Sequence, residues 1–423
     1  MKLIYYVAIL AMGGFIFNGY SQDYKKTGGL ARLTGMGANI YVADPFFATI
    51  NPAWNSVYDN FLMGDLGSSV GTPFSAGGSG QFISANFRLN NNWTVGGLLT
   101  RNDFNGLSIA LLDPGTNNSL GLPFPGVVST VNDIVGGGNN VVVPLDNNVE
   151  LMGTYSFGNT SVGLGVAYAS TSNDFTPDTG AISEGSGSQI GFNLGILTNI
   201  SGNFKVDAGI SFAFPSASYK PGIGFETNAS QTIILANARG FWKHSSKITV
   251  VPVVAFATAS GSFETSGSSA DLNSFTAFAL GLGMNYTVDD FLLAGGILYN
   301  TNTLTIPGNV ATSTPDLDYG ATNFPVWNIG MEWTMLDWLV ARLGYVAVSG
   351  NATIQTPGTT GVNEFTTSYF LPASRGFTVG VGFRLGDFSI DATINEDVLR
   401  QGLNNIGGGG ATFAYLSTSY ALP

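Results

Sequence analysis

The residues that could do chemistry in this sequence are few. Charged residues make up only 10% of the 423 residues, and the single histidine, His244, falls near a predicted short turn. A Ser–His site needs its histidine beside the nucleophile, and no inward-facing cluster lies near this turn. Cysteine is absent, so neither a thiolate metal site nor a disulfide framework can form. We therefore expect no catalytic residues, no metal, no cofactor and no enzymatic activity.

The remaining charges are spaced for pairing across strands. If Leu336–Trp338 is a three-residue turn, Glu332 lies opposite Arg342 on one face. The other charges placed on the same inward face by period-two counting are Arg384, Asp391, Lys205 and Asp207. Such charges could form a structural ladder of cross-strand pairs, which we favour, or hold a plug or tune selectivity.

The elements that carry these charges read as strands. In residues 376–395, apolar side chains alternate with small polar ones on both sides of a Gly386-Asp387 turn. A strand shows successive side chains to opposite faces, so this hairpin has one apolar and one polar face. The same pattern predicts sixteen strands: residues 61–70, 82–89, 93–101, 149–157, 161–170, 190–200, 204–214, 233–243, 248–256, 278–288, 291–299, 327–335, 339–349, 376–385, 388–395 and 412–422.

The connections between these strands alternate in length. Short turns alternate with long Gly/Ser/Thr/Pro-rich loops, at residues 104–148, 174–187, 215–229, 307–322, 356–371 and 399–410. Outer-membrane barrels have short periplasmic turns and long external loops. We therefore predict an all-β fold, an antiparallel transmembrane barrel of 14–16 strands in the outer membrane of a Gram-negative bacterium. A soluble β-sandwich, propeller or adhesin is the alternative. The net charge of −12 argues against nucleic-acid binding.

The N-terminal residues precede the strands and have a different composition. Lys2, the apolar run Leu3–Ile16 and the small residues Gly19 and Ser21 have the form of a secretory signal. We expect a signal peptide at residues 1–21, a hatch or plug at 22–60 and the barrel at 61–423.

The predicted hatch carries a spaced motif. Its residues are Arg32, Gly35, Met36, Gly37, Asp44, Asn51, Pro52 and Ala53. The pattern R-x-x-G-M-G…D…N-P-A resembles the N-terminus of FadL/TodX-type outer-membrane transporters of long-chain fatty acids and hydrocarbons. The resemblance implies about fourteen strands, a hatch inside the lumen and gating by the motif residues. Here the chain ends in Pro423 rather than in a terminal aromatic residue.

The resemblance implies passive uptake of hydrophobic small molecules, gated by the hatch. Type IX secretion shuttle barrels look similar at the N-terminus, so a secretion-associated or structural barrel that binds proteins through its external loops stays open. A general diffusion porin suits the plug and the few inward charges poorly. We expect a monomer whose partners are a hydrophobic ligand, outer-membrane lipid and the outer-membrane assembly machinery.

One predicted external loop is unusually apolar. Residues 104–148 include Leu120, Leu122, Phe124, Val128, Val131 and Ile134, and the apolar spacing of residues 126–135 is helical. This loop could gather hydrophobic solutes at the mouth of the barrel, or it could be a folded lid without a role in ligand binding.

Overall fold

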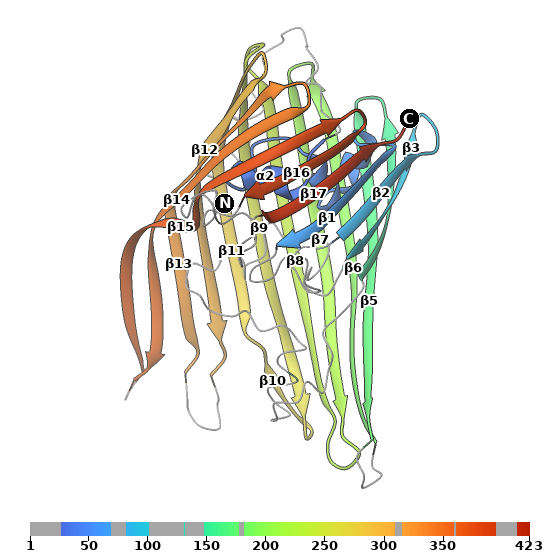
Figure 1. The fold of residues 1–423 in the computed structure, drawn as a ribbon. Helices are drawn as coiled ribbons and strands as arrows, with labels where there is room; N and C mark the ends of the chain where they lie inside the picture. Colours follow the sequence, from blue (N-terminus) through green and yellow to red (C-terminus); the bar gives the residue numbers. More distant parts are fainter. Residues whose placement is uncertain are drawn as a thin grey trace, which may run out of the picture.

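The strands form one closed antiparallel barrel (Figure 1). The computed structural model describes residues 27–68, 82–100, 131, 148–176, 182–308, 315–358, 361–394 and 413–423. Closure is made by β1 (Phe61–Ser68), which pairs with β2 (Phe82–Arg88) on one side and β17 (Phe413–Ala421) on the other. In a closed wall every strand has a partner on both sides, so no backbone N–H or C=O group of a strand edge is left unpaired in lipid, which offers no hydrogen-bond partners.

Between these, the wall strands follow one another in chain order. They are β3 (Trp93–Thr100), β4 (Asn148–Phe157), β5 (Thr160–Phe175), β6 (Ser183–Ser201), β7 (Phe204–Lys220), β8 (Thr227–Lys243), β9 (Ile248–Thr265), β11 (Ser274–Val288), β12 (Phe291–Ile306), β13 (Leu317–Leu336), β14 (Leu339–Pro357), β15 (Val362–Leu385) and β16 (Phe388–Ile394). The short β10 (Ser268–Asp271) pairs only with the end of β9 within the described residues. Of the seventeen described strands, sixteen therefore build the wall, which confirms the predicted fold class and exceeds the fourteen that the resemblance implies.

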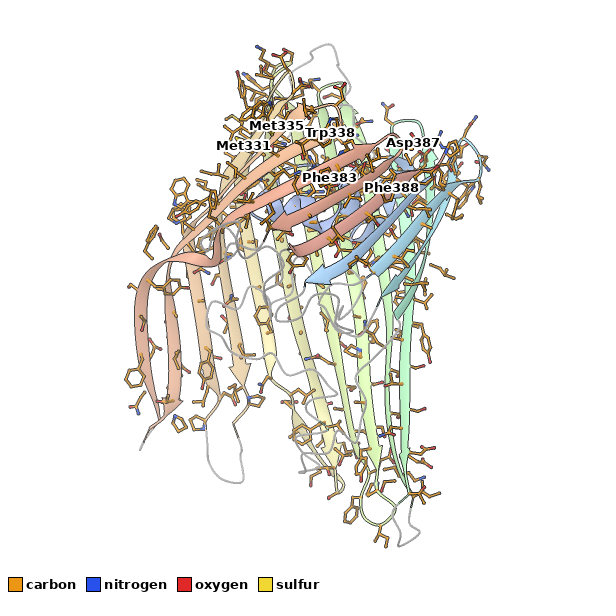
Figure 2. The ribbon with its side chains drawn as sticks, viewed as in Figure 1. Met331, Met335, Trp338, Phe383, Asp387 and Phe388 are labelled. Atoms are coloured by element: carbon orange, nitrogen blue, oxygen red, sulfur yellow. The ribbon has the colours of Figure 1, made fainter. Side chains whose placement is uncertain are left out.

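The outer face of the wall is apolar over a band of limited height. On β7 the outward side chains from Phe204 to Phe214 are all apolar, and the next two outward residues are Ser216 and Ser218. Ten residues at about 3.3 Å each, tilted by about 40°, cover roughly 25 Å, the height of an outer-membrane apolar band. Figure 2 shows Met335, Trp338 and Phe388 projecting from this face near the short turns, and all are exposed. The barrel is thus an outer-membrane protein of the Gram-negative type, as predicted.

Beyond that band, several strands continue past the predicted limits. β6 begins at Ser183 rather than residue 190, and β15 begins at Val362 rather than 376. Most of the predicted long loops are correspondingly shorter; for example, only residues 221–226 join β7 to β8. The β6 extension has Glu184, Ser186 and Ser188 on its outward face, so it lacks the alternation that marks a lipid-facing strand. The β15 extension differs, because Phe365 and Phe370 are exposed among its polar residues.

The N-terminal segment lies inside the barrel, nearer the end with the short turns (Figure 1). Its elements are α2 (Leu30–Gly35) and the 3₁₀-helices η1 (Pro45–Thr49) and η2 (Pro52–Ser56). Each 3₁₀-helix starts with proline after an acceptor side chain. Asp44 accepts a hydrogen bond from the Phe46 N–H, and Asn51 accepts one from the Ala53 N–H. Proline at the first position fits the helix, and the side chain caps a free N–H. Among the described residues, no helix has the length and apolarity to span a membrane.

The largest apolar core forms between this segment and the wall. Its fully buried members include Trp54, Phe46 and Tyr58 from the segment, and Phe241 from β8 packs edge-on to Trp54, with ring centroids 6.3 Å apart. The N-terminal segment is therefore a packed plug, hereafter the hatch, and the predicted position of a hatch in the lumen is confirmed.

Pro252 lies within β9, and proline has no N–H to donate to a ladder. The β8–β9 ladder pairs Arg239 with Val253 and Trp242 with Val250, and it has no pairs in between. The register is the same on both sides of the gap. Pro252 therefore opens the pairing locally without shifting the wall.

Candidate functional site

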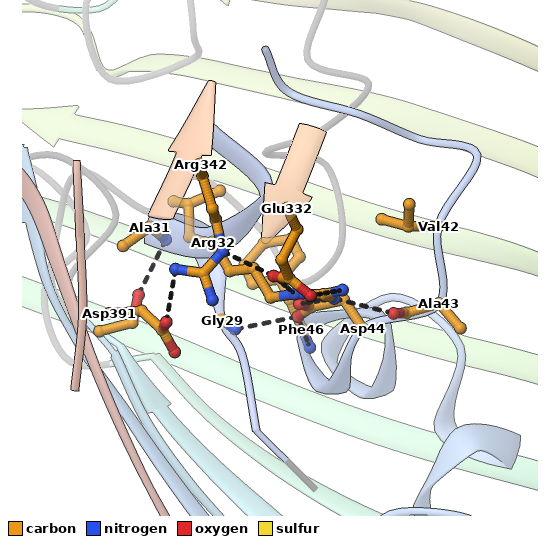
Figure 3. Close-up of polar contacts among 12 residues, drawn as sticks. Gly29, Ala31, Arg32, Val42, Ala43, Asp44, Phe46, Glu332, Arg342 and Asp391 are labelled. Carbon is orange, nitrogen blue, oxygen red and sulfur yellow. Dashed lines mark hydrogen bonds and ion pairs between the residues drawn. The ribbon is translucent and has the colours of Figure 1, made fainter. Parts of the chain in front are cut away.

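The first half of the hatch is held by buried ion pairs (Figure 3). Arg32 of α2 binds Asp44 of the hatch (Nη1–Oδ2 2.9 Å) and Glu332 of β13 (Nε–Oε2 2.7 Å). Arg342 of β14 binds the same Glu332 oxygen at 2.6 Å and Asp391 of β16 at 2.7 Å. Glu332 pairs with Arg342 across β13 and β14, as predicted. The predicted three-residue turn is wrong, because Leu336 pairs with Leu339 and only Asp337 and Trp338 form the turn, with a bulge at Met335 that restores the register.

The network is completed by Arg384, whose Nη2 lies 2.9 Å from Asp391 Oδ1. Arg32, Arg342 and Arg384 thus balance Asp44, Glu332 and Asp391. Burial raises the pKa of Asp44 to about 6, although Arg32 opposes the rise, so this carboxylate is ionised at neutral pH. Burial lowers the pKa of Arg32, but Glu332 and Asp44 outweigh it and raise the pKa well above its usual value. The charges are compensated, as buried charges must be.

Small residues bring the hatch backbone against the wall. Gly37 has φ +73, and a side chain there would meet the backbone of Tyr345 at 3.0 Å. Gly35 packs in the same way on Gly380 of β15, with 3.1 Å from its ideal Cβ to the Gly380 Cα. Wall amides then reach the hatch carbonyls, as in the 2.7 Å bond from Asn285 Nδ2 to Tyr41 O. Only glycine permits both this approach and the left-handed backbone of Gly37.

The second half of the hatch is held through Asn51. Its Nδ2 donates to Asp207 Oδ1 of β7 at 2.6 Å and to the carbonyls of Ala208 (3.1 Å) and Ile196 (3.2 Å). Its Oδ1 accepts from Ala53 N at 2.9 Å. One side chain therefore both starts η2 and fastens it to β6 and β7.

The wall leaves space for this motif at two glycines. A Cβ on Gly163 of β5 would overlap Pro52 and Ala53, and one on Gly195 of β6 would overlap the Asn51 amide. Thr154 of β4 adds a 2.6 Å hydrogen bond from its hydroxyl to Pro52 O. The N-P-A stretch is thus seated in a groove of the wall made by missing side chains.

Asp207 also binds an arginine that the sequence analysis did not single out. Arg239 of β8 donates from Nε to Asp207 Oδ2 at 2.9 Å and from Nη2 to the same oxygen. Its Nη1 donates to the hatch carbonyls of Ile40 (3.0 Å) and Val42 (3.3 Å). The guanidinium carbon lies 3.6 Å from the ring centroid of Phe47 in η1. Arg239 therefore joins the wall to both η1 and the chain before it.

A cavity of about 170 Å³ lies between the hatch and strands β7 to β12. The hatch contributes Ile40, Phe47, Ile50 and Asn51. The wall contributes the lumen-facing residues Asp207, Asn237, Arg239, Val253, Ala255, Ala257, Phe275, Ala277, Ala279, Leu298, Asn300 and Asn302, together with Thr301 and the exposed Val254, Phe256 and Phe278. Most of this lining is apolar, with a few polar groups, as is usual for small-molecule sites.

Apolar side chains continue from this cavity along the lumen toward the external end. A cluster of Leu235, Ala257, Phe275 and Leu304 with Ala213 and Ala259 adjoins the cavity through shared residues. A separate cluster, of Ala217, Ala229, Leu272 and Val131, lies toward the outer ends of β7 and β8, with the buried Gln231 of β8 between the two clusters. We call the cavity and these two clusters the apolar track.

The predicted site residues are placed as follows. Arg32, Gly35, Gly37, Asp44, Asn51, Pro52 and Ala53 all lie in the hatch and are buried. Glu332, Arg342, Arg384 and Asp391 meet in one network, and Asp207 lies apart from them beside Asn51. Lys205 is inside the barrel near Trp54, with its Nζ 6.0 Å from the ring.

Of the apolar loop, only Val131 belongs to the described residues. It is helical, as the spacing of residues 126–135 predicts, and fully buried in the outer cluster of the apolar track. Leu120, Leu122, Phe124, Val128 and Ile134 lie outside the described residues, as does the predicted signal peptide at 1–21.

Sequence reasoning missed Glu150 as well as Arg239. Glu150 of β4 is fully buried, and its Oε1 accepts a 2.7 Å hydrogen bond from Asn193 Nδ2. Period-two counting from Val149 could have placed it inward, because Val149 and Leu151 are outward and exposed.

Comparison with known proteins gives fold likeness only. No protein-family model and no curated protein matches the sequence. A Pseudomonas aeruginosa FadL homologue is 12% identical with a TM-score of 0.40, over 92% of this chain and 96% of that chain. The Pseudomonas putida toluene transporter TodX is 10% identical with a TM-score of 0.37, over 96% of both chains.

The ferric preacinetobactin receptor BauA of Acinetobacter baumannii is 10% identical with a TM-score of 0.44, over 79% of this chain. This chain matches about half of that receptor, 53% of its length. Sequence identities and TM-scores this low do not support any comparison of function. The chain is similar in fold to FadL/TodX-type outer-membrane barrels, the resemblance that the hatch motif predicts.

Proposed function

We propose that this barrel lets hydrophobic small molecules cross the outer membrane passively, and that the hatch is its gate. The observation that carries the proposal is the apolar track, which leads along one side of the lumen to a cavity against the hatch. A water-filled diffusion channel would instead have a polar interior. No chemical step is involved, and we propose no enzymatic activity.

The hatch is suited to gating because its two halves are held by different forces. Ion pairs of Arg32 hold α2 to Glu332 of β13 and to Asp44, the residue that caps η1, whereas η2 is fastened to the wall by Asn51 and the chain around η1 by Arg239. The cavity borders the second attachment, through Phe47, Ile50 and Asn51. A molecule in the cavity therefore touches the half of the hatch whose release would open a path.

Transfer of apolar surface from water into this cavity supplies the driving force, about 25 cal/mol per Å² buried. The amide groups at its margin, Asn237, Asn300 and Asn302, can orient a polar end of the ligand. Fatty acids and hydrocarbons are the classes that the sequence resemblance implies.

Native mass spectrometry of the purified barrel tests the proposal. We expect a retained hydrophobic molecule that is lost when a bulky side chain fills the cavity, as in Ala277→Phe. The control is Gly153→Ala, a position with no atom within 4 Å of the new Cβ. A preparation that never retains or takes up a hydrophobic molecule, with rapid sugar permeation in liposomes, would contradict the proposal.

A secretion-associated or structural role is the second candidate, and one observation favours it. Ile223 and Phe225 are 87% and 70% exposed in the connection between β7 and β8, at the external end of the wall. Exposed apolar side chains at a loop tip are available for contact with a protein or a membrane. A photo-crosslinker at position 225 in living cells should capture one defined protein under this alternative. Labelling of lipid alone would exclude a protein partner there.

A further inference from the structure

The positive charge of Arg239 in the cavity lining is already neutralised by Asp207. Arg239 gives Nε and Nη2 to one carboxylate oxygen of Asp207 and Nη1 to two hatch carbonyls. Both side chains are almost fully buried, with exposed fractions of 7% and 2%. A guanidinium has five N–H donors, and four of the five are accounted for by these bonds. Phe47 covers one face of the group.

An anionic ligand would therefore find no free positive charge here. A carboxylate that approached Arg239 would have to displace the hatch carbonyls of Ile40 and Val42, and it would lie close to the negative charge of Asp207. Burying a carboxylate without a free counter-charge is costly, whereas burying an apolar group is favourable. The other polar groups of the lining, such as Asn237 and Asn300, are neutral.

The volume is sufficient for such an apolar group. At about 170 Å³, the cavity is close to the roughly 150 Å³ of an apolar cavity that binds benzene. A single aromatic ring or a short apolar chain fits within it.

We infer that the cavity selects neutral apolar molecules over anions, and that Asp207 sets this selection by neutralising Arg239. The inference rests on the proposed function and narrows its ligand class. It assigns Asp207 a role in specificity beyond its hydrogen bond to Asn51.

The test compares methyl benzoate with benzoate, which share a ring and differ in charge. Binding to the purified full-length barrel is measured by calorimetry at pH 8, where benzoate is ionised. We expect the ester to bind at least about ten-fold more tightly than the anion. Equal or tighter binding of benzoate to the unaltered protein would overturn the inference without any variant being needed.

Two variants locate the cause. Asp207→Asn keeps an oxygen for Asn51 but frees the charge of Arg239, and Asn237→Lys adds an uncompensated cation to the lining without touching the Asp207–Arg239 pair. Each should shift the affinity ratio toward benzoate by about ten-fold or more, while Asp337→Asn, at an exposed turn, should not. Gel mobility before and after heating reports whether each barrel is folded.

The outcomes separate the two proposals. If both ligands bind and the ratio is the same in all folded variants, Asp207 does not set specificity, and the proposed function stands. If neither ligand binds, and Ala277→Phe leaves uptake unchanged, the cavity is no ligand site and both proposals fail.

Discussion

Asn51 is the residue on which the second half of the hatch depends. Its amide reaches the charged Asp207 and two strand carbonyls, and its oxygen starts η2. Few single side chains in the described hatch combine a cap with contacts to two strands. The consequence of losing it can therefore be stated in energetic terms.

Replacing Asn51 by alanine should release η2 while the barrel stays folded. The lost cap is worth about 1 kcal/mol and the hydrogen bond to a carboxylate about 1.5–3 kcal/mol. Hydrogen exchange at residues 45–56 should speed up, and uptake of a hydrophobic dye by cells should rise. A barrel that no longer folds would show that the motif is structural and that Asn51 is not part of a gate.

The glycines facing the motif give a second prediction. Gly163→Ala should push the N-P-A stretch off the wall, because its Cβ would overlap Pro52 and Ala53. Gly153→Ala on the neighbouring strand is the matched control, since its Cβ meets nothing. Limited proteolysis of the hatch measures the effect. Equal protease resistance in the two variants would mean that the wall yields rather than the hatch.

Individual pairings could be predicted only where a short turn fixes the register. Counting outward from an assumed three-residue turn places Glu332 opposite Arg342; the observed turn has two residues, and the irregularity between Thr334 and Leu336 makes up the difference. Asp207 and Arg239 are also directly opposite, but their strands are joined at the far, external end. No count from a short turn connects them, and the hatch carbonyls that bind Arg239 cannot be inferred from strand periodicity.

Among the elements, α2 should be the part of the hatch most sensitive to charge. Glu332→Gln removes the carboxylate shared by Arg32 and Arg342. Breaking a buried ion pair costs about 3–5 kcal/mol because the partner is left uncompensated. Exchange at residues 30–36 should increase strongly, with little change at residues 52–56.

Asp337→Asn is the control for this variant, since Asp337 is exposed at the turn between β13 and β14. If Glu332→Gln loosened η2 as much as α2, the hatch would move as one body, and the division into two separately held halves would be wrong.

The strands themselves were predictable in number but not in length. Period-two alternation of apolar and small residues marks the part of each strand that crosses the apolar band. Past that band both faces can be polar, as at Ser216 and Ser218 of β7, and the pattern gives no sign that the strand goes on. The hatch helices were not predictable from periodicity, because they are short and buried on all sides.

For the whole molecule, the account predicts a barrel closed to hydrophilic solutes. The hatch fills the lumen with packed side chains, of which Trp54, Phe46 and Met36 are fully buried. Liposomes that contain the barrel should swell slowly in sugars of any size, and Asn51→Ala should raise the rate only modestly, since α2 stays in place. Rapid swelling of the unaltered protein would indicate an open porin.

The central claim, that the hatch must move for hydrophobic molecules to pass, can be tested with a reversible lock. The sequence contains no cysteine, and an ideal Cβ on Gly209 lies 3.6 Å from the Cβ of Asn51. This distance is within the roughly 3.5–4.5 Å found in disulfides. The pair Asn51→Cys and Gly209→Cys should therefore bond the hatch to β7 on oxidation.

The measurement is uptake of a neutral hydrophobic dye by cells that carry the double variant, oxidised and then reduced. The account predicts that oxidation stops the uptake supported by the barrel, and that a reductant restores it. The single variants Asn51→Cys and Gly209→Cys should not respond to either treatment. Undiminished uptake with the disulfide fully formed would contradict the account, because molecules would then pass without movement of the hatch.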